Sequence, residues 1–163
     1  MIAVLQRVKR AAVRVEGETV GNCGHGLCIL LGVAKGDTEE DARLLAAKIC
    51  NLRIFTDEND KMNLSVKSID GEALVISQFT LMANYKHGNR PDYLESAPPA
   101  EANRLYEYFK GLMAAELRTA ISVAVYNGDT QLSQTLQYSA DTYGNNQSGT
   151  LLELCKALFA YSD

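Results

Sequence analysis

Long hydrophobic runs are missing from this sequence, since no apolar stretch approaches the ~20 residues that a membrane-spanning helix requires. The opening segment, MIAVLQRVKR, places a short apolar run before its charges, which is the reverse of the order in a secretory signal. We therefore expect a cytoplasmic protein that has no membrane partner.

Metal-binding patterns are also absent. The chain has two histidines, His25 and His87, and its four cysteines form no CxxC pair, so a zinc site would need an unusual ligand set. The glycine-containing segment 21–26 lacks the Lys-Ser/Thr ending of a P-loop and follows a short hairpin, which also excludes a Rossmann fingerprint. We expect buried free thiols, no metal and no cofactor.

Basic residues are too few for a protein that coats nucleic acid, because 16 Lys and Arg face 20 Asp and Glu for a net charge of −4. This charge does not exclude an enzyme that contacts only the end of a nucleic acid. The charge is uneven: residues 1–14 carry four cations and no acid. In residues 119–152, Asp129 and Asp141 are the only charges.

The remaining composition is that of an ordinary globular protein, with 163 residues, 47% apolar and 22% charged. We expect one domain over residues 1–163, of which 118–163 are atypical. Alternating or continuous apolar patterns predict strands. These strands cover residues 2–7, 11–16, 18–21, 26–33, 51–55 and 72–79.

Two helices are predicted between these strands. Asp37 has the acid Glu40 three residues on, as in a capping box, and apolar residues follow at helical spacing, which predicts a helix over about 38–50. A second apolar face predicts a helix over about 99–117, capped by Ser96 or Ala97. Strands that alternate with helices indicate an α/β fold. After the second helix, we expect a strand over 121–126, a turn at 127–128 and a helical or mixed segment over 151–161.

Polar side chains gather where the apolar strand 72–79 ends. Ser77, Gln78 and Thr80 supply hydroxyls and an amide, and Phe79 supplies a stacking face for a base. The alternative is a strand end whose hydroxyls bond to nearby backbone. We keep both interpretations open.

Four further residues are candidates for ligand contact. Lys86 and Arg90 belong to a glycine-containing basic loop that could meet a phosphate or ribose, or form a solvated turn. Arg7 interrupts an apolar alternation, so it lies either on an exposed strand face or in a site. Met62, after an acidic turn, could line a pocket.

Ordered motifs over about residues 1–117 resemble those of D-aminoacyl-tRNA deacylases. The matching segments are QRV (6–8), LLGV (30–33), GDTEED (36–41), NLRIF (51–55), KMNLS (61–65), SQFTL (77–81), GNRP (88–91), APP (97–99) and LYE (105–107). The resemblance implies a three-layer α/β/β fold whose mixed sheets form a barrel-like core with two helices. It also implies a cytoplasmic homodimer with active sites at the subunit interface.

The same resemblance implies the chemistry. Members hydrolyse the ester that joins a D-amino acid, or glycine mischarged on tRNA(Ala), to the 3′-terminal adenosine of tRNA, which is chiral proofreading in translation. It makes Ser77, Gln78 and Thr80 catalytic and places Phe79 near the adenine. Thr80 would be the nucleophile or would position water; hydrolysis assisted by the ribose 2′-OH is the competing route. The substrate-binding set is Phe79, Arg7, Met62, Lys86 and Arg90.

The C-terminal part departs from this family. Members end with a strand carrying Asn-x-Gly-Pro-Val-Thr, whose Gly-cis-Pro enters the partner's pocket and excludes L-amino acids. This chain has no proline after Pro99, and Arg7 would lose the loop that it supports. Divergence, a reading-frame shift after about residue 117 and loss of deacylation all fit. The alternatives are therefore a non-catalytic dimeric module that binds tRNA ends or a protein, and a hydrolase with relaxed chirality.

Overall fold

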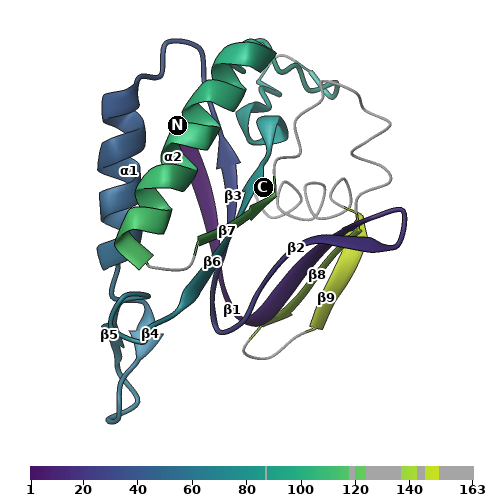
Figure 1. Ribbon diagram of the computed structural model, residues 1–163. Helices are drawn as coiled ribbons and strands as arrows, with labels where there is room; N and C mark the ends of the chain where they lie inside the picture. The colour runs from purple at the N-terminus through teal and green to yellow at the C-terminus, as the bar shows by residue number, and fades with distance from the viewer. Residues whose placement is uncertain (87, 118–119, 124–136, 143–145, 151–163) are drawn as a thin grey trace.

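Two helices pack on one side of a curled β-sheet (Figure 1). The computed structural model describes residues 1–86, 88–117, 120–123, 137–142 and 146–150. His87, the predicted turn at 127–128 and the predicted segment 151–161 lie outside these residues.

The helices are α1 (Glu39–Asn51) and α2 (Pro99–Leu117), with a 3₁₀ helix η1 (Phe79–Met82). The strands are β1 (Ile2–Val15), β2 (Glu18–Cys23), β3 (Gly26–Gly32), β4 (Phe55–Thr56), β5 (Met62–Leu64), β6 (Glu72–Ser77), β7 (Ala120–Val123), β8 (Gln137–Thr142) and β9 (Asn146–Thr150).

The sheet runs β7-β6-β3-β1-β8-β9, with β2 also paired to β1. Strands β3, β6 and β7 are parallel, and such strands need long crossover connections, which α1 and α2 supply. Strand β1 joins the two parts of the sheet, because its first half pairs with β3 and its second half pairs with β2 and β8. The expected α/β fold with two helices is confirmed, and the sheet curls into a half-barrel (Figure 1).

Strand β3 is buried on both faces, as its continuous apolar sequence predicts. Leu27, Ile29 and Leu31 belong to the cluster that contains the buried faces of α1 and α2. Cys28 and Leu30 belong to a second cluster with β1 and β2. The end of β3 is therefore held from both sides, which makes it a firm support for whatever packs against it.

Three predicted boundaries were wrong. The predicted strands 2–7 and 11–16 form one long strand, β1, which ends at Val15. Residue 51 ends α1, and only Phe55 of the predicted strand 51–55 lies in a strand. Strand β6 stops at Ser77, because the chain turns into η1 two residues later. Strands β5, β8 and β9 were not predicted.

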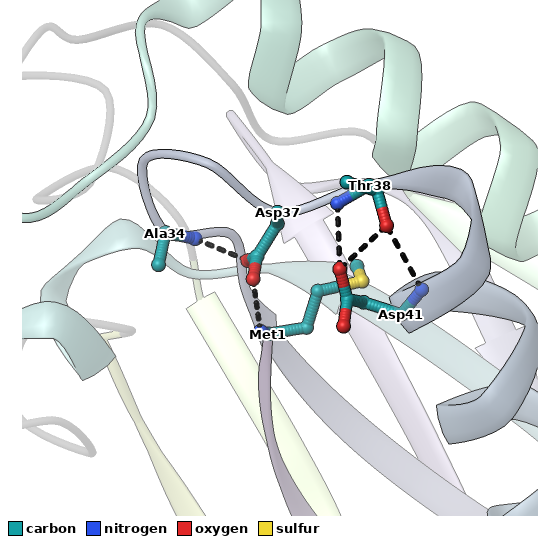
Figure 2. A network of polar contacts seen from close by, with 5 residues as sticks. All are labelled: Met1, Ala34, Asp37, Thr38 and Asp41. Atoms are coloured by element: carbon teal, nitrogen blue, oxygen red, sulfur yellow. Dashed lines mark hydrogen bonds and ion pairs between the residues drawn. The ribbon is translucent and has the colours of Figure 1, made fainter.

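The N-cap of α1 is Thr38, one residue later than predicted (Figure 2). The Asp41 N–H donates to Thr38 Oγ1 at 3.4 Å and the Thr38 N–H donates to Asp41 Oδ2 at 2.8 Å, so the capping box is real but shifted. The Thr38 hydroxyl, which donates to Asp41 Oδ2 at 2.6 Å, and the Thr38 N–H together lower the pKa of the Asp41 carboxyl. Asp37 instead accepts from the Met1 ammonium and from the Ala34 N–H, each at 2.6 Å. The carboxylate expected to cap the helix therefore fixes the β3–α1 connection.

The described cysteines are buried free thiols, as predicted: Cys23, Cys28 and Cys50. Burial raises the pKa of Cys23 and of Cys50 from 9.0 to about 11, so both remain protonated at neutral pH. Within the part of the chain that the structure describes, no helix is long and apolar enough to cross a bilayer.

Candidate functional site

Buried polar side chains concentrate where β6 ends. The buried polar residues among those described are Ser65, Ser77, Gln78 and Thr80, each less than 9% exposed. Three of these four fall within four consecutive positions, whereas buried polar groups are usually scattered and satisfied locally. The polar side chains of Ser77, Gln78 and Thr80 are therefore buried together where β6 ends.

The backbone around Gln78 turns from strand to 3₁₀ helix. The Gln78 N–H donates to the Leu31 carbonyl at 2.7 Å, which continues the pairing of β6 with β3 by one residue. Gln78 then acts as the extended N-cap position of η1. Its side-chain amide donates to Thr80 Oγ1, so the amide and the hydroxyl form one buried pair. This bond orients the Thr80 hydroxyl.

A glycine on β3 allows η1 to pack closely. A Cβ at Gly32 would lie 2.8 Å from Met82 Cε, 3.1 Å from the Gln78 carbonyl oxygen and 3.1 Å from Leu81 Cβ. Any larger residue would push against the backbone that carries Gln78 and Thr80. Gly32 therefore sets the distance between the central strand and the candidate site.

Phe79 joins this polar segment to an open cavity of about 350 Å³. Its carbonyl accepts from Ser96 Oγ at 3.2 Å, and its ring meets the Tyr93 ring edge to face, with centroids 5.4 Å apart. The described residues that line the cavity are Lys35, Phe79, Tyr93, Leu94, Ser96, Ala97, Pro98 and Pro99. Aromatic and prolyl surfaces with a few polar groups suit a flat ring system such as a base.

The other wall of the cavity is the segment that follows β3. Residues Ala34 and Ser96 form an antiparallel bridge, the Lys35 N–H donates to the Glu95 carbonyl at 2.9 Å, and the Ala97 N–H donates to the Val33 carbonyl at 3.0 Å. These bonds tie residues 33–35 to residues 95–97. The carboxylate of Asp37 then anchors the same connection to Met1 (Figure 2).

No sequence pattern predicts that residues 93–94 and 96–99 line a cavity with Lys35. The sequence predicts only that Ser96 or Ala97 caps the second helix. In the structure Pro98 supplies the carbonyl that accepts the first bond of α2, from the Ala102 N–H at 2.9 Å, and the Ser96 hydroxyl turns to Phe79 instead. The available signal was the aromatic and aliphatic pair Tyr93 and Leu94 between Pro91 and Pro98, which the structure leaves exposed.

The remaining predicted residues do not line this cavity. Lys86 and Arg90 are exposed in a loop closed by the bridge between Asn84 and Asp92. In the chain, this loop lies between η1 and Tyr93.

Arg7 and Met62 lie elsewhere. Arg7, on β1, is partly buried and its Nη1 donates to the Ile54 carbonyl at 2.8 Å. Met62 is 67% exposed on the β4–β5 hairpin, which projects from the opposite end of the molecule from η1 (Figure 1). Within one chain, the structure brings neither residue to the Ser77–Thr80 segment.

Comparison with solved structures first defines the class of fold. A structure titled "c-Myc DNA Unwinding Element Binding Protein" is 31% identical with a TM-score of 0.76, over 90% of this chain and 96% of that one. Another, titled as a probable eukaryotic D-amino acid tRNA deacylase, is 13% identical with a TM-score of 0.68, over 90% of this chain and 98% of that one. The second likeness bears on the fold alone.

Sequence comparison then gives the family. The family model described as D-Tyr-tRNA(Tyr) deacylase matches residues 4–137. A D-aminoacyl-tRNA deacylase of Haemophilus influenzae (strain PittGG) is 52% identical over 83% of this chain and 92% of its own length. One from Dehalococcoides mccartyi (strain CBDB1) is 59% identical over 71% of this chain and 76% of its own. The chain belongs to the D-Tyr-tRNA(Tyr) deacylase family.

Proposed function

We propose that this protein hydrolyses the ester bond of D-aminoacyl-tRNA and releases the free D-amino acid and the tRNA. Family membership supports the reaction. The single structural observation that carries it is the buried pair of Gln78 and Thr80 on either side of Phe79, which lines a cavity of about 350 Å³. An ester at the end of a nucleotide needs polar groups near a base-sized pocket.

The cavity is the proposed site of the terminal adenosine. Phe79 and Tyr93 offer aromatic surfaces to the adenine, and Pro98 and Pro99 cover it from the α2 side. With the base against Phe79, the ribose lies toward the polar segment that begins at Gln78. The aminoacyl ester on the ribose then approaches the buried amide–hydroxyl pair.

The chemistry requires orientation more than strong base catalysis. An aminoacyl ester is already activated, so placing water and stabilising the oxyanion can supply much of the rate. The Phe79 N–H opens η1, and an N–H at a helix start makes no bond within that helix, so it is a candidate oxyanion donor. A threonine is a weak nucleophile unless a base takes its proton. The Gln78 amide donates to Thr80 Oγ1 and fixes the position of this hydroxyl. We assign Thr80 to orienting water or the ribose 2′-OH, in a reaction that requires no metal or cofactor.

We further propose a cytoplasmic homodimer of single-domain subunits in which the partner completes each active site. Arg7 and Met62, assigned to substrate binding by family resemblance, lie away from the cavity of their own chain, which fits a role in the partner's site. Glycyl-tRNA mischarged on tRNA(Ala) is a second proposed substrate, because a pocket that rejects an L side chain accepts a residue without one.

A non-catalytic module that binds tRNA ends is the second candidate. The observation that favours it is the absence of proline after Pro99, which removes the Gly-Pro element that enforces chirality in the family. An active enzyme with relaxed chirality would follow if the pocket functions without that element.

The test incubates the purified protein with D-Tyr-tRNA and L-Tyr-tRNA and measures release of tyrosine. Hydrolysis of the D-ester with at least tenfold preference supports the proposed enzyme. Equal hydrolysis of both esters supports relaxed chirality. Hydrolysis of neither ester, with retained binding of uncharged tRNA, contradicts the enzyme and supports the binding module.

A second experiment assigns Thr80. We expect Thr80→Ala to lower kcat about tenfold, since the water or 2′-OH loses its orienting hydroxyl while backbone donors remain. The matched control is Thr38→Ala, which removes an exposed threonine hydroxyl at the start of α1. An unchanged kcat in Thr80→Ala would show that the hydroxyl is not needed. A D-Tyr-tRNA with a 2′-deoxy terminal adenosine then tests the 2′-OH.

A further inference from the structure

Lys35 lies at the edge of the cavity of about 350 Å³ that Phe79 and Tyr93 also line. Among the described lining residues, it alone carries a formal charge, and its side chain is exposed. The rest of the lining is aromatic, aliphatic or prolyl, apart from the hydroxyls of Ser96 and Tyr93. An apolar cavity with a single cation at its edge suits a ligand that has a flat apolar body and one negative group.

The backbone that carries this lysine is fixed. The Lys35 N–H donates to the Glu95 carbonyl at 2.9 Å. On the preceding side, Ala34 bridges Ser96 and donates its N–H to Asp37, which also holds the Met1 ammonium (Figure 2). The flexible four-carbon side chain therefore extends from an anchored position, which gives its ammonium a defined region to reach.

The acidic groups beside Lys35 leave its charge available. Asp37 is occupied by the Met1 ammonium and the Ala34 N–H. Glu95 is exposed, and it is the backbone carbonyl of Glu95 that takes part in the bond to Lys35. Glu39, at the start of α1, pairs with Arg104 at 2.5 Å.

The ligand in the proposed function has its negative group in the matching place. A terminal adenosine carries the aminoacyl ester on the 2′,3′ side of its ribose and a phosphodiester on the 5′ side. If the ester approaches Gln78 and Thr80 and the base lies on Phe79, the 5′ side points toward the open edge of the cavity. We propose that Lys35 binds the phosphodiester that joins the terminal adenosine to the preceding nucleotide. This inference rests on the proposed function for the identity of the ligand.

The consequence is selectivity for a nucleoside that is attached to RNA. A single lysine contact to a phosphate of single-stranded RNA contributes a slope of about −0.7 in log K against log salt. At an exposed position it changes affinity by about three- to fivefold. Lys35 thus affects binding of the tRNA end and leaves the chemical step unchanged.

The binding experiment uses adenosine and the dinucleotide cytidylyl-(3′→5′)-adenosine, which contains one phosphodiester. We expect calorimetry to show that the wild-type protein binds the dinucleotide about three- to fivefold more tightly than adenosine. Lys35→Met removes this difference and leaves adenosine binding unchanged, and Lys35→Arg restores part of it. The matched control is Lys48→Met, an exposed lysine in the last turn of α1 that lies about 15 Å along the helix from its N-cap.

The kinetic experiment uses D-Tyr-tRNA. We expect Lys35→Met to raise KM about three- to fivefold, keep kcat and reduce the salt slope by about 0.7. An unchanged dinucleotide preference in Lys35→Met would overturn the inference, as would an equal loss of adenosine binding. Failure of the proposed function is distinct, because it would appear as no hydrolysis by the wild type while the binding measurement still tests Lys35.

Discussion

Gly32→Ala tests whether close packing of β3 against η1 sets the geometry of the candidate site. The added methyl group would lie 2.8 Å from Met82 Cε, which is the flexible end of a side chain and can rotate away. It would also lie 3.1 Å from the Gln78 carbonyl oxygen and 3.1 Å from Leu81 Cβ. These two atoms belong to or adjoin the backbone, so η1 must shift by a few tenths of an ångström.

Two opposing terms give the size of the effect. Replacing a strand glycine with alanine recovers about 0.5–1 kcal/mol of conformational entropy. Overpacking a filled core costs about 1–3 kcal/mol. We expect a net loss of about 1–2 kcal/mol, which lowers Tm by about 2–8 °C in a chain of this size. Because the shift moves Gln78 and its bond to Thr80, hydrolysis falls about tenfold.

The assay combines thermal unfolding with hydrolysis of D-Tyr-tRNA. The control is Gly111→Ala on an exposed turn of α2, where an added Cβ meets nothing within 4 Å. That variant should gain about 0.5–1 kcal/mol and keep its activity. If Gly32→Ala is as stable and active as the wild type, η1 does not pack as tightly on β3 as described.

Four further outcomes are expected. Asp37→Asn should lose about 1–2 kcal/mol in urea unfolding, because its carboxylate holds the terminal ammonium; no loss would contradict that role. Ser96→Ala should reduce deacylation about threefold by releasing the Phe79 carbonyl; an unchanged rate would refute this support. Cys23 and Cys50 should react with a thiol reagent at pH 8 only after unfolding, as mass spectrometry of labelled peptides would show. Since burial raises their pKa from 9.0 to about 11, the native state keeps these protons longer, and stability should fall as pH rises from 9 to 11.

The helices followed closely from the sequence. Helix α2 has the predicted bounds, 99–117, because its apolar face repeats at helical spacing and prolines precede it. Helix α1 begins one residue later than predicted, because Asp37 bonds to the Met1 ammonium, which is 36 positions away in the chain. A capping pattern cannot reveal a competitor so distant in sequence.

The candidate site was only half visible in the sequence. The grouping of Ser77, Gln78 and Thr80 followed from their place at the end of an apolar strand. Lys35 and Ser96 were missed because no local pattern brings residues 33–35 beside residues 95–97. That approach depends on the crossover between β3 and β6 and on the packing of α2.

The α/β class, the buried central strand, the two helices and the polar segment follow from the amino-acid sequence alone, because each depends on local periodicity or on neighbouring residues. Its ordered motifs also indicated the family to which the chain belongs. The folded chain is needed to show that Phe79, Tyr93 and Lys35 share one cavity and that Arg7 and Met62 do not line it. The physical reason is that hydrogen bonds and packing between distant segments, which set those positions, leave no periodic trace in the chain.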